Sequence, residues 1–211
     1  MLSQAQVGPL ATTSSLPVGT QANLRTGNMG DLIDTKLQPD YYESCYRRAN
    51  FGAANQTGRV TTVGPALTCN GICLSNPIGS TVNLVPTFVG YSFPVAPAAA
   101  VVVGIMIGYN SSTNVTHTTA ITPRSNFFGV GASPVGLVDE VATLPTAPIV
   151  AKILGTVYTA AITTSPTAGP ALTDLKGSII LPPGAYMAIF TSTVANTAGF
   201  LGSIDWVEVP V

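Results

Sequence analysis

The sequence predicts an all-β protein, namely a jelly-roll-like antiparallel β-sandwich with an extended N-terminal arm that contains at most one short helix. Val, Ile, Thr and aromatic residues occur in short runs, and Pro, Gly, Ser and Asn separate these runs. The chain contains 15 Ser, 27 Thr, 21 Gly and 17 Pro residues, a composition typical of strands and turns rather than helices. The even spacing of the runs favours a sandwich or jelly roll.

Charge divides the chain into two parts. Only 8% of the residues are charged, against about 25% in an average soluble domain. Nine charged side chains lie between Arg25 and Arg59, and the 152 residues from 60 to 211 carry only eight. We therefore expect an N-terminal arm over residues 1–59 and a nearly neutral β-sandwich over residues 60–211.

The same arithmetic argues against several classes of partner. A formal net charge of -1 provides no basic surplus for neutralising phosphates, so no nucleic-acid partner is expected. The most apolar run, residues 95–109, is shorter than the roughly 20 residues of a membrane-spanning helix. The first ten residues have neither the basic nor the apolar region of a signal peptide. We expect no membrane partner.

The arm holds the residues best suited to binding another protein. Residues 37–48 are expected to form a short helix, with Pro39 in its first turn and Tyr42 and Tyr46 on one face. Arg and Tyr are enriched at interface hot spots. The expected contact residues are Arg25, Tyr41, Tyr42, Tyr46, Arg47 and Arg48. Alternatively, the helix packs under the sandwich with Arg47 or Arg48 paired to Glu43.

From residue 59 onward the pattern predicts strands. The expected strands are residues 59–63, 68–74, 82–91, 98–109, 115–122, 136–141, 149–158, 176–181, 185–193 and 200–209. Leu181-Pro-Pro-Gly-Ala185 is expected to be a hairpin turn of type II, because Pro183 precedes Gly184 and both flanks are apolar. Phe127 and Phe128, close to Arg124, are expected to belong to the core, and the alternative is that they form a second contact surface.

The three cysteines predict no disulfide framework. Cys45, Cys69 and Cys73 are odd in number, and the last two form a C-x3-C pattern. On a regular strand Cys69 and Cys73 would lie on one face about 13 Å apart, too far for a bridge. We expect buried free thiols and no metal site.

The sequence contains no recognisable catalytic constellation, so a non-enzymatic protein without a cofactor is expected. His117 lies in a Thr-rich strand and would need an orienting carboxylate and a nucleophile to act as a base. Asp139 and Glu140 are neighbours, so on a strand they face opposite sides and do not form a glycosidase pair by themselves. Gly129-Val-Gly131 lacks the continuation of a nucleotide-binding motif.

Several short motifs follow one another along the chain: Gly27-Asn-Met-Gly-Asp-Leu-Ile33, Tyr41-Tyr-Glu43, Arg47-Arg-Ala-Asn50, Cys69-Asn-Gly-Ile-Cys-Leu-Ser-Asn-Pro77, Val89-Gly-Tyr91, Val95-Ala-Pro97, His117-Thr-Thr-Ala-Ile-Thr-Pro-Arg124, Leu181-Pro-Pro-Gly184 and Gly199-Phe-Leu-Gly202 with Trp206. In their order the chain resembles uncharacterised structural proteins of tailed bacteriophages over most of its length. The resemblance implies a virion component that is made in the host cytoplasm, and it carries over no catalytic motif.

Together these features predict a capsid decoration or cement protein on the outer surface of the virion. The arm would bind the major capsid protein, and the charge-poor body would associate with copies of itself, expected as a homotrimer. Two alternatives remain open at this point. One is another virion component, such as a head-fibre base, a tail protein or an adaptor. The other is a carbohydrate-binding jelly roll with rim aromatics such as Tyr109, Phe128 or Tyr158.

Overall fold

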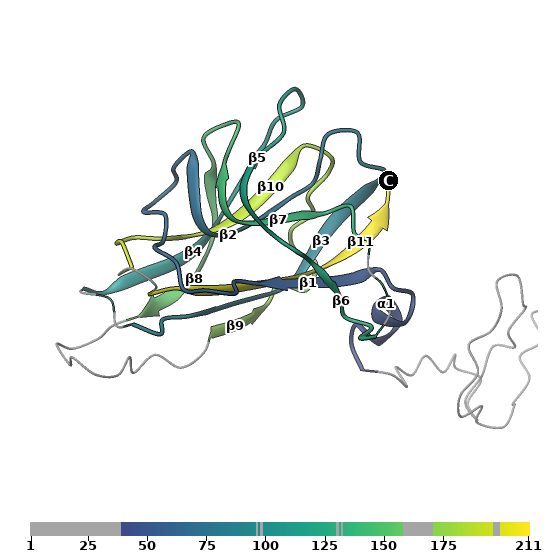
Figure 1. The fold of residues 1–211 in the computed structure, drawn as a ribbon, viewed down its shortest axis with the longest axis horizontal. Helices are drawn as coiled ribbons and strands as arrows, with labels where there is room; N and C mark the ends of the chain where they lie inside the picture. Colours follow the sequence, from purple (N-terminus) through teal and green to yellow (C-terminus); the bar gives the residue numbers. More distant parts are fainter. Residues whose placement is uncertain are drawn as a thin grey trace, which may run out of the picture. The chain divides into compact units, whose positions relative to one another are not determined.

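Two antiparallel sheets pack face to face in the computed structural model (Figure 1). The structure describes residues 39–95, 97, 99–129, 131, 133–157, 171–195 and 199–211. The elements are α1 (Tyr42–Tyr46), β1 (Asn50–Ala54), β2 (Thr68–Ser75), β3 (Val82–Ser92), β4 (Val101–Tyr109), β5 (Thr116–Ile121), β6 (Arg124–Ser125), β7 (Leu137–Thr143), β8 (Ile149–Val157), β9 (Ala171–Asp174), β10 (Ala185–Thr191) and β11 (Leu201–Pro210). None of the described helices is long and apolar enough to cross a membrane.

The strand order confirms the predicted jelly-roll sandwich. One sheet has the order β6-β1-β11-β3-β9, and the other has the order β5-β7-β2-β10-β4-β8. Strands β5, β6 and β7 follow β4 and extend one end of each sheet. Without them, two four-stranded sheets remain, β1-β11-β3-β9 and β2-β10-β4-β8, in which strands from opposite ends of the chain alternate as in a jelly roll.

One hydrophobic core fills the space between the sheets. Trp206, Phe200, Leu84 and Ile105 are fully buried there, and residues of both sheets belong to the same cluster. A second cluster, which includes Met106, lies on the other face of the six-stranded sheet, because neighbouring residues of β4 point to opposite faces. Burial on both faces explains why β10 is buried at every position.

Two of the expected strands are not strands. Residues 59–63 form only isolated bridges, Arg59 to Phe200 and Val63 to Thr191, and residues 176–181 contribute only the bridge from Leu181 to Leu84. Three short strands, β1, β6 and β9, were not expected. The sequence of β1, Asn-Phe-Gly-Ala-Ala, has no β-branched residue, so its pairing with β11 and β6 comes from its neighbours rather than from propensity.

The sandwich also begins earlier than expected. β1 falls inside the segment 1–59 that we expected to be the arm, yet it pairs with β11 over its whole length, from Asn50 opposite Val207 to Ala54 opposite Ser203. The chain from Tyr41 onward belongs to one compact unit with the strands.

The expected turn at residues 181–185 is present, but the expected hairpin is wrong. The Ala185 amide donates to the Pro182 carbonyl over 2.9 Å, and Gly184 has φ +87°, as a type II turn requires. The flanks do not pair with each other: β10 pairs with β2 and β4, whereas Leu181 bridges to β3 in the opposite sheet. The turn therefore carries the chain from one sheet to the other.

Cys69 and Cys73 are buried free thiols, as expected, whereas Cys45 is a free thiol that is only partly buried. The pairing of β2 with β7 shifts between Asn70 and Cys73, and Gly71 adopts φ +119°, which only glycine tolerates easily. The irregularity lets the Cys73 side chain interact with Cys69. Hydrogen bonding with Cys69 and burial raise the pKa of the Cys73 thiol.

Candidate partner-contact surface

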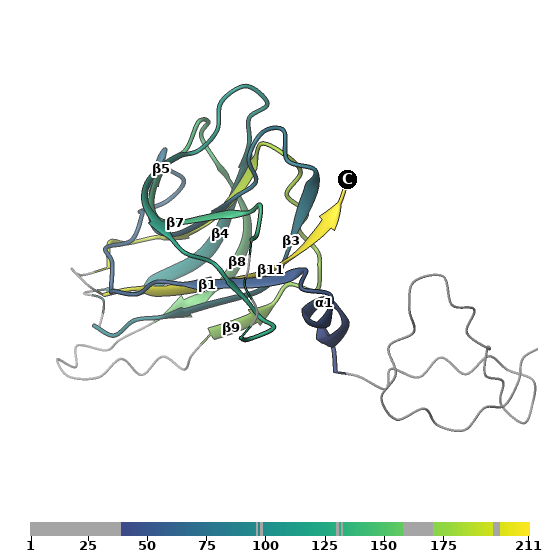
Figure 2. The same ribbon diagram turned by 45° about the vertical axis from the view of Figure 1, so that its right-hand side comes forward.

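The short helix α1 is fixed to the sandwich through Tyr41. The Tyr41 hydroxyl donates to Asp174 Oδ1 over 2.7 Å, and its ring meets Phe88 edge to face at 5.2 Å. Phe88 and Asp174 are cross-strand partners on β3 and β9. Since Val89 points into the core, Phe88 points to the outer face of the five-stranded sheet. Figure 1 and Figure 2 both show the helix at the end of the sandwich where β1 begins.

The helix is shorter than expected, and both of its ends carry unusual backbone. Ser44 and Cys45 carbonyls accept hydrogen bonds from the Ala49 and Arg48 amides, each over 2.9 Å, which is the Schellman motif that ends many helices. The residue at its left-handed position is Arg48, with φ +59°, where glycine is usual. Tyr41, at the other end, has φ +68°. Two of the three described non-glycine residues with positive φ therefore flank α1.

Three aromatic side chains form a continuous exposed series beside this helix. The rings of Tyr42 and Tyr46 stack at 6.1 Å with an interplanar angle of 13°, and Phe127 lies 6.3 Å from Tyr46. Their exposed fractions are 44%, 46% and 38%. We call Tyr42, Tyr46 and Phe127 the aromatic patch. Phe128, the next residue in the chain, is 88% exposed.

Phe127 reaches the patch because the segment after β6 is tied to β1. The Asn126 amide donates to the Asn50 carbonyl over 3.0 Å, and its side chain donates to the Asn50 side-chain oxygen over 2.6 Å. The expectation that Phe127 and Phe128 belong to the core was wrong. Both lie in the turn that follows the short edge strand β6, where the structure leaves both rings exposed.

Among the described charged residues on and next to α1, one cationic side chain has no ion-pair partner. Arg47 Nε donates to Glu43 Oε1 over 2.6 Å in a pair that is mostly exposed, and an exposed pair of this kind contributes little stability. Within the described part of the chain, the Arg48 side chain makes no ion pair or hydrogen bond. Arg48 therefore presents its guanidinium to solvent beside the aromatic patch.

The structure brings together five of the six expected contact residues. Tyr42, Tyr46, Arg47 and Arg48 are exposed on or next to α1, whereas Tyr41 is partly buried as the anchor of the helix. Arg25 lies outside the described residues. Of the rim aromatics expected for carbohydrate binding, Tyr109 ends β4 in one sheet and Phe128 follows β6 in the other, and Tyr158 lies outside the described residues.

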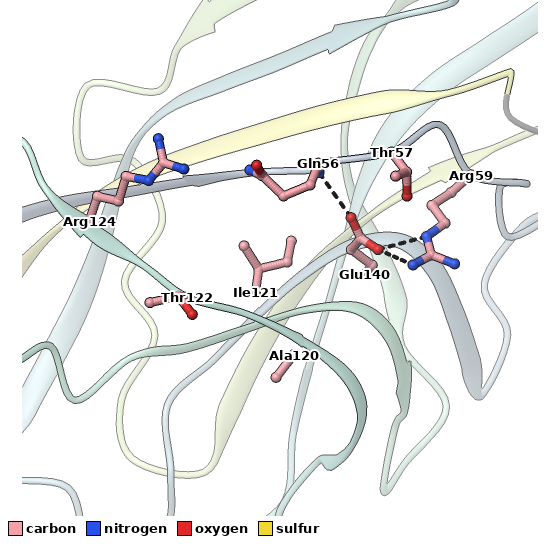
Figure 3. Close-up of a pocket in the computed structure, with 8 residues that line it drawn as sticks. All are labelled: Gln56, Thr57, Arg59, Ala120, Ile121, Thr122, Arg124 and Glu140. Atoms are coloured by element: carbon pink, nitrogen blue, oxygen red, sulfur yellow. Dashed lines mark hydrogen bonds and ion pairs between the residues drawn. The ribbon is translucent and has the colours of Figure 1, made fainter.

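A second surface feature is a hollow of about 580 Å³ next to β6 (Figure 3). We call it the β6 hollow. Its lining comes from the segment after β1, from β5 and β6, and from β7: Gln56, Thr57, Arg59, Ala120, Ile121, Thr122, Arg124 and Glu140. Sequence reasoning did not find this group, because no motif links residues of four separate segments.

Glu140, which is buried, and Arg59, which is partly exposed, form an ion pair at one end of this hollow. Arg59 donates through Nε, over 2.7 Å, and through Nη2 to the same carboxylate oxygen, and the Gln56 amide donates to the other oxygen over 3.0 Å. Burial by itself would raise the pKa of Glu140, but these hydrogen bonds outweigh burial and hold that pKa below its usual value. The pair is therefore ionised at neutral pH.

Asp139 supplies the carboxylate that orients the His117 imidazole, a partner that the sequence alone did not identify. Its Nδ1 lies 2.5 Å from Asp139 Oδ2, and Asp139 is fully buried with no partner for Oδ1. Burial raises the pKa of Asp139, and the hydrogen bond with His117 opposes that rise in part. No described side chain hydrogen-bonds to the other imidazole nitrogen. The described residues contain no group of three or more His, Cys, Asp or Glu residues arranged to hold a metal ion.

Comparison of the chain with protein-family models, with curated proteins and with solved structures found no match.

Proposed function

We propose that this chain is a non-enzymatic structural protein of a phage virion, a capsid decoration or cement protein that binds the major capsid protein of the assembled head. The observation that carries the proposal is the aromatic patch beside Arg47 and Arg48. Exposed Tyr and Arg side chains, with stacked rings held in place by a fixed helix, have the composition of an interface hot spot.

The backbone around α1 supports a role for its side chains. A non-glycine residue in the left-handed region costs of order 1–3 kcal/mol, and such residues cluster at functional sites. Glycine would relieve this cost at Arg48, so an arginine stands at a position where the backbone alone favours another residue. Contact of the guanidinium with a partner would account for a cation there.

The proposed self-association as a homotrimer rests on the surface of the sandwich. The edge strands β8 and β9 expose apolar side chains: Ile149 is 67%, Ile153 60% and Leu172 68% exposed. Few charged residues of the body separate these side chains, and apolar surface without charge is typical of subunit contacts. Jelly rolls occur in viral capsid proteins, an analogy at the level of the fold only.

The test uses heads that lack this protein. Wild-type protein should bind them, and Tyr46→Ala should bind at least about tenfold more weakly, because an interface aromatic is worth 2 kcal/mol or more. Tyr109→Ala is the matched control, since Tyr109 is 57% exposed but lies at the end of β4. Light scattering on each variant should give three times the chain mass of 21.5 kDa.

Equal binding of heads by Tyr46→Ala and Tyr109→Ala would show that the aromatic patch is not part of the contact with the capsid. A monomeric wild-type protein would contradict the proposed trimer. These two outcomes are separate, because the patch and the edge strands β8 and β9 lie on different elements.

A further inference from the structure

We propose that the β6 hollow binds a small sugar acid, and that the Arg124 guanidinium takes the carboxylate of this ligand. The site is separate from the aromatic patch, so the inference does not depend on the proposed function. Arg124 stands on β6, three residues before Phe127, and is one of the residues that line the hollow (Figure 3).

The charges of the hollow favour a ligand with a single negative charge. Glu140 and Arg59 neutralise each other, and both carboxylate oxygens of Glu140 already accept hydrogen bonds. Arg124 is exposed, and in the described part of the chain its side chain forms no ion pair or hydrogen bond. The hollow therefore has one uncompensated positive charge. A guanidinium matches a carboxylate with two parallel hydrogen bonds, and one positive charge balances a carboxylate but not a dianion such as phosphate.

The neutral groups of the hollow suit a ligand with several hydroxyls. Thr57 and Thr122 are exposed, and among the described residues their hydroxyls have no hydrogen-bond partner. Gln56 donates its side-chain amide to the Ala54 carbonyl over 3.1 Å, which leaves its side-chain oxygen to accept. Hydroxyls both donate and accept, so they pair with the hydroxyls of a sugar in either direction.

The volume of the β6 hollow and its apolar lining also favour a sugar acid over a bare anion. The volume of about 580 Å³ lies within the roughly 300–1,000 Å³ typical of small-molecule sites. Figure 3 shows Gln56 and Ile121 between Arg124 and the Arg59–Glu140 pair, so the polar groups are spread along the hollow. Ile121, which is 7% exposed, contributes an apolar side chain against which a sugar ring can lie.

The test is a titration of the full-length, ¹⁵N-labelled protein with D-glucuronate. D-glucose, which lacks the carboxylate, and acetate, which lacks the ring, are the matched ligands. Glucuronate should shift the resonances of Gln56, Thr57 and Arg124, and glucose and acetate should bind at least about tenfold more weakly. Arg124→Gln should weaken glucuronate binding by about tenfold, the loss expected for a charge-assisted hydrogen bond.

Arg48→Gln is the control variant, because Arg48 is an equally exposed arginine beside the aromatic patch. It should leave glucuronate binding unchanged. Absence of shifts at the hollow, equal binding by Arg124→Gln, or equally tight binding of acetate would overturn the proposal. It would also be overturned if Arg124→Gln weakened binding to heads while glucuronate left the hollow unchanged, since the occupant would then be a protein carboxylate. Failure of the wild-type protein to bind heads would refute only the proposed function.

Discussion

Folding shifts the pKa values of two carboxyl groups of the sandwich in opposite directions. Burial raises the pKa of Asp205, and the hydrogen bond from Asn126 offsets only part of that rise. Glu140 is also buried, but its hydrogen bonds with Arg59 and the Gln56 amide lower its pKa. Glu140 therefore adds stability above its unfolded pKa of about 4.3, and that stability is lost as pH falls through the folded value. Ionised Asp205 instead lowers stability above its raised pKa.

Glu140→Gln and Asp205→Asn should consequently change the pH dependence of stability with opposite signs. At pH 7, Glu140→Gln should lower the free energy of unfolding by about 1–3 kcal/mol, because it weakens charged hydrogen bonds. This difference should shrink as the pH falls below the unfolded pKa of about 4.3 and through the lowered pKa of folded Glu140. Asp205→Asn should be as stable as the wild type or more so at pH 7, and its advantage should vanish in acid. Urea unfolding between pH 3 and 8 measures both effects.

Glu43→Gln is the control for these measurements, because Glu43 forms only an exposed pair with Arg47. Its effect should stay within about 0.5 kcal/mol at every pH. Changes of the same sign in Glu140→Gln and Asp205→Asn would contradict the assigned causes.

At the scale of the element, helix α1 combines a standard C-terminal motif with an unusual residue. Its five residues are too few to be stable alone, so the helix depends on Tyr41 and on the Schellman hydrogen bonds. Arg48 occupies the left-handed position of that motif with φ +59°. Substitutions at Arg48 can therefore separate the free-energy cost of its left-handed backbone from the contribution of its exposed guanidinium.

Arg48→Gly should stabilise the protein by about 0.5–1 kcal/mol relative to Arg48→Ala, because both variants lose the guanidinium and only glycine relieves the left-handed backbone. Both variants should bind heads more weakly than the wild type. The midpoint of urea unfolding, compared at equal slope, measures the difference in stability. Equal midpoints for the two variants would show that Arg48 is not strained.

Local patterns predicted the elements whose form is decided locally. The spacing of Tyr42 and Tyr46 predicted that they lie on one helix face, where their rings stack, and Pro183-Gly184 predicted the turn. The partner of each strand is a long-range choice. β10 is buried at every position because it lies inside a sheet between β2 and β4, and its largely apolar sequence also fits one strand of a hairpin.

The same distinction between local and long-range contacts applies to the candidate sites. The sequence placed Tyr42, Tyr46, Arg47 and Arg48 together because they are neighbours along the chain. It did not place Phe127 beside Tyr46, since that contact depends on the pairing of β6 with β1. Arg59 and Glu140 are 81 residues apart in sequence and meet only because the jelly roll closes.

At the scale of the whole molecule, the low charge content belongs to a jelly roll with exposed apolar edge strands. The body has eight charged residues among its last 152, and several of these are engaged within the fold: Asp139 with His117, Glu140 with Arg59, and Glu208 with the amides of Val135 and Gly136. Few charges remain to keep copies apart. The low charge of this surface is the basis of the proposed self-association, and the proposed contact helix α1 lies within the charged segment 25–59.

The most direct test of the proposed function compares assembled and unassembled capsid protein. A cement protein stabilises a shell because it binds the assembled state and not its parts. Wild-type protein should therefore co-sediment with heads that lack it, and it should not bind unassembled capsid subunits under the same conditions. Failure to bind heads, or equal binding to heads and to free subunits, would contradict the account.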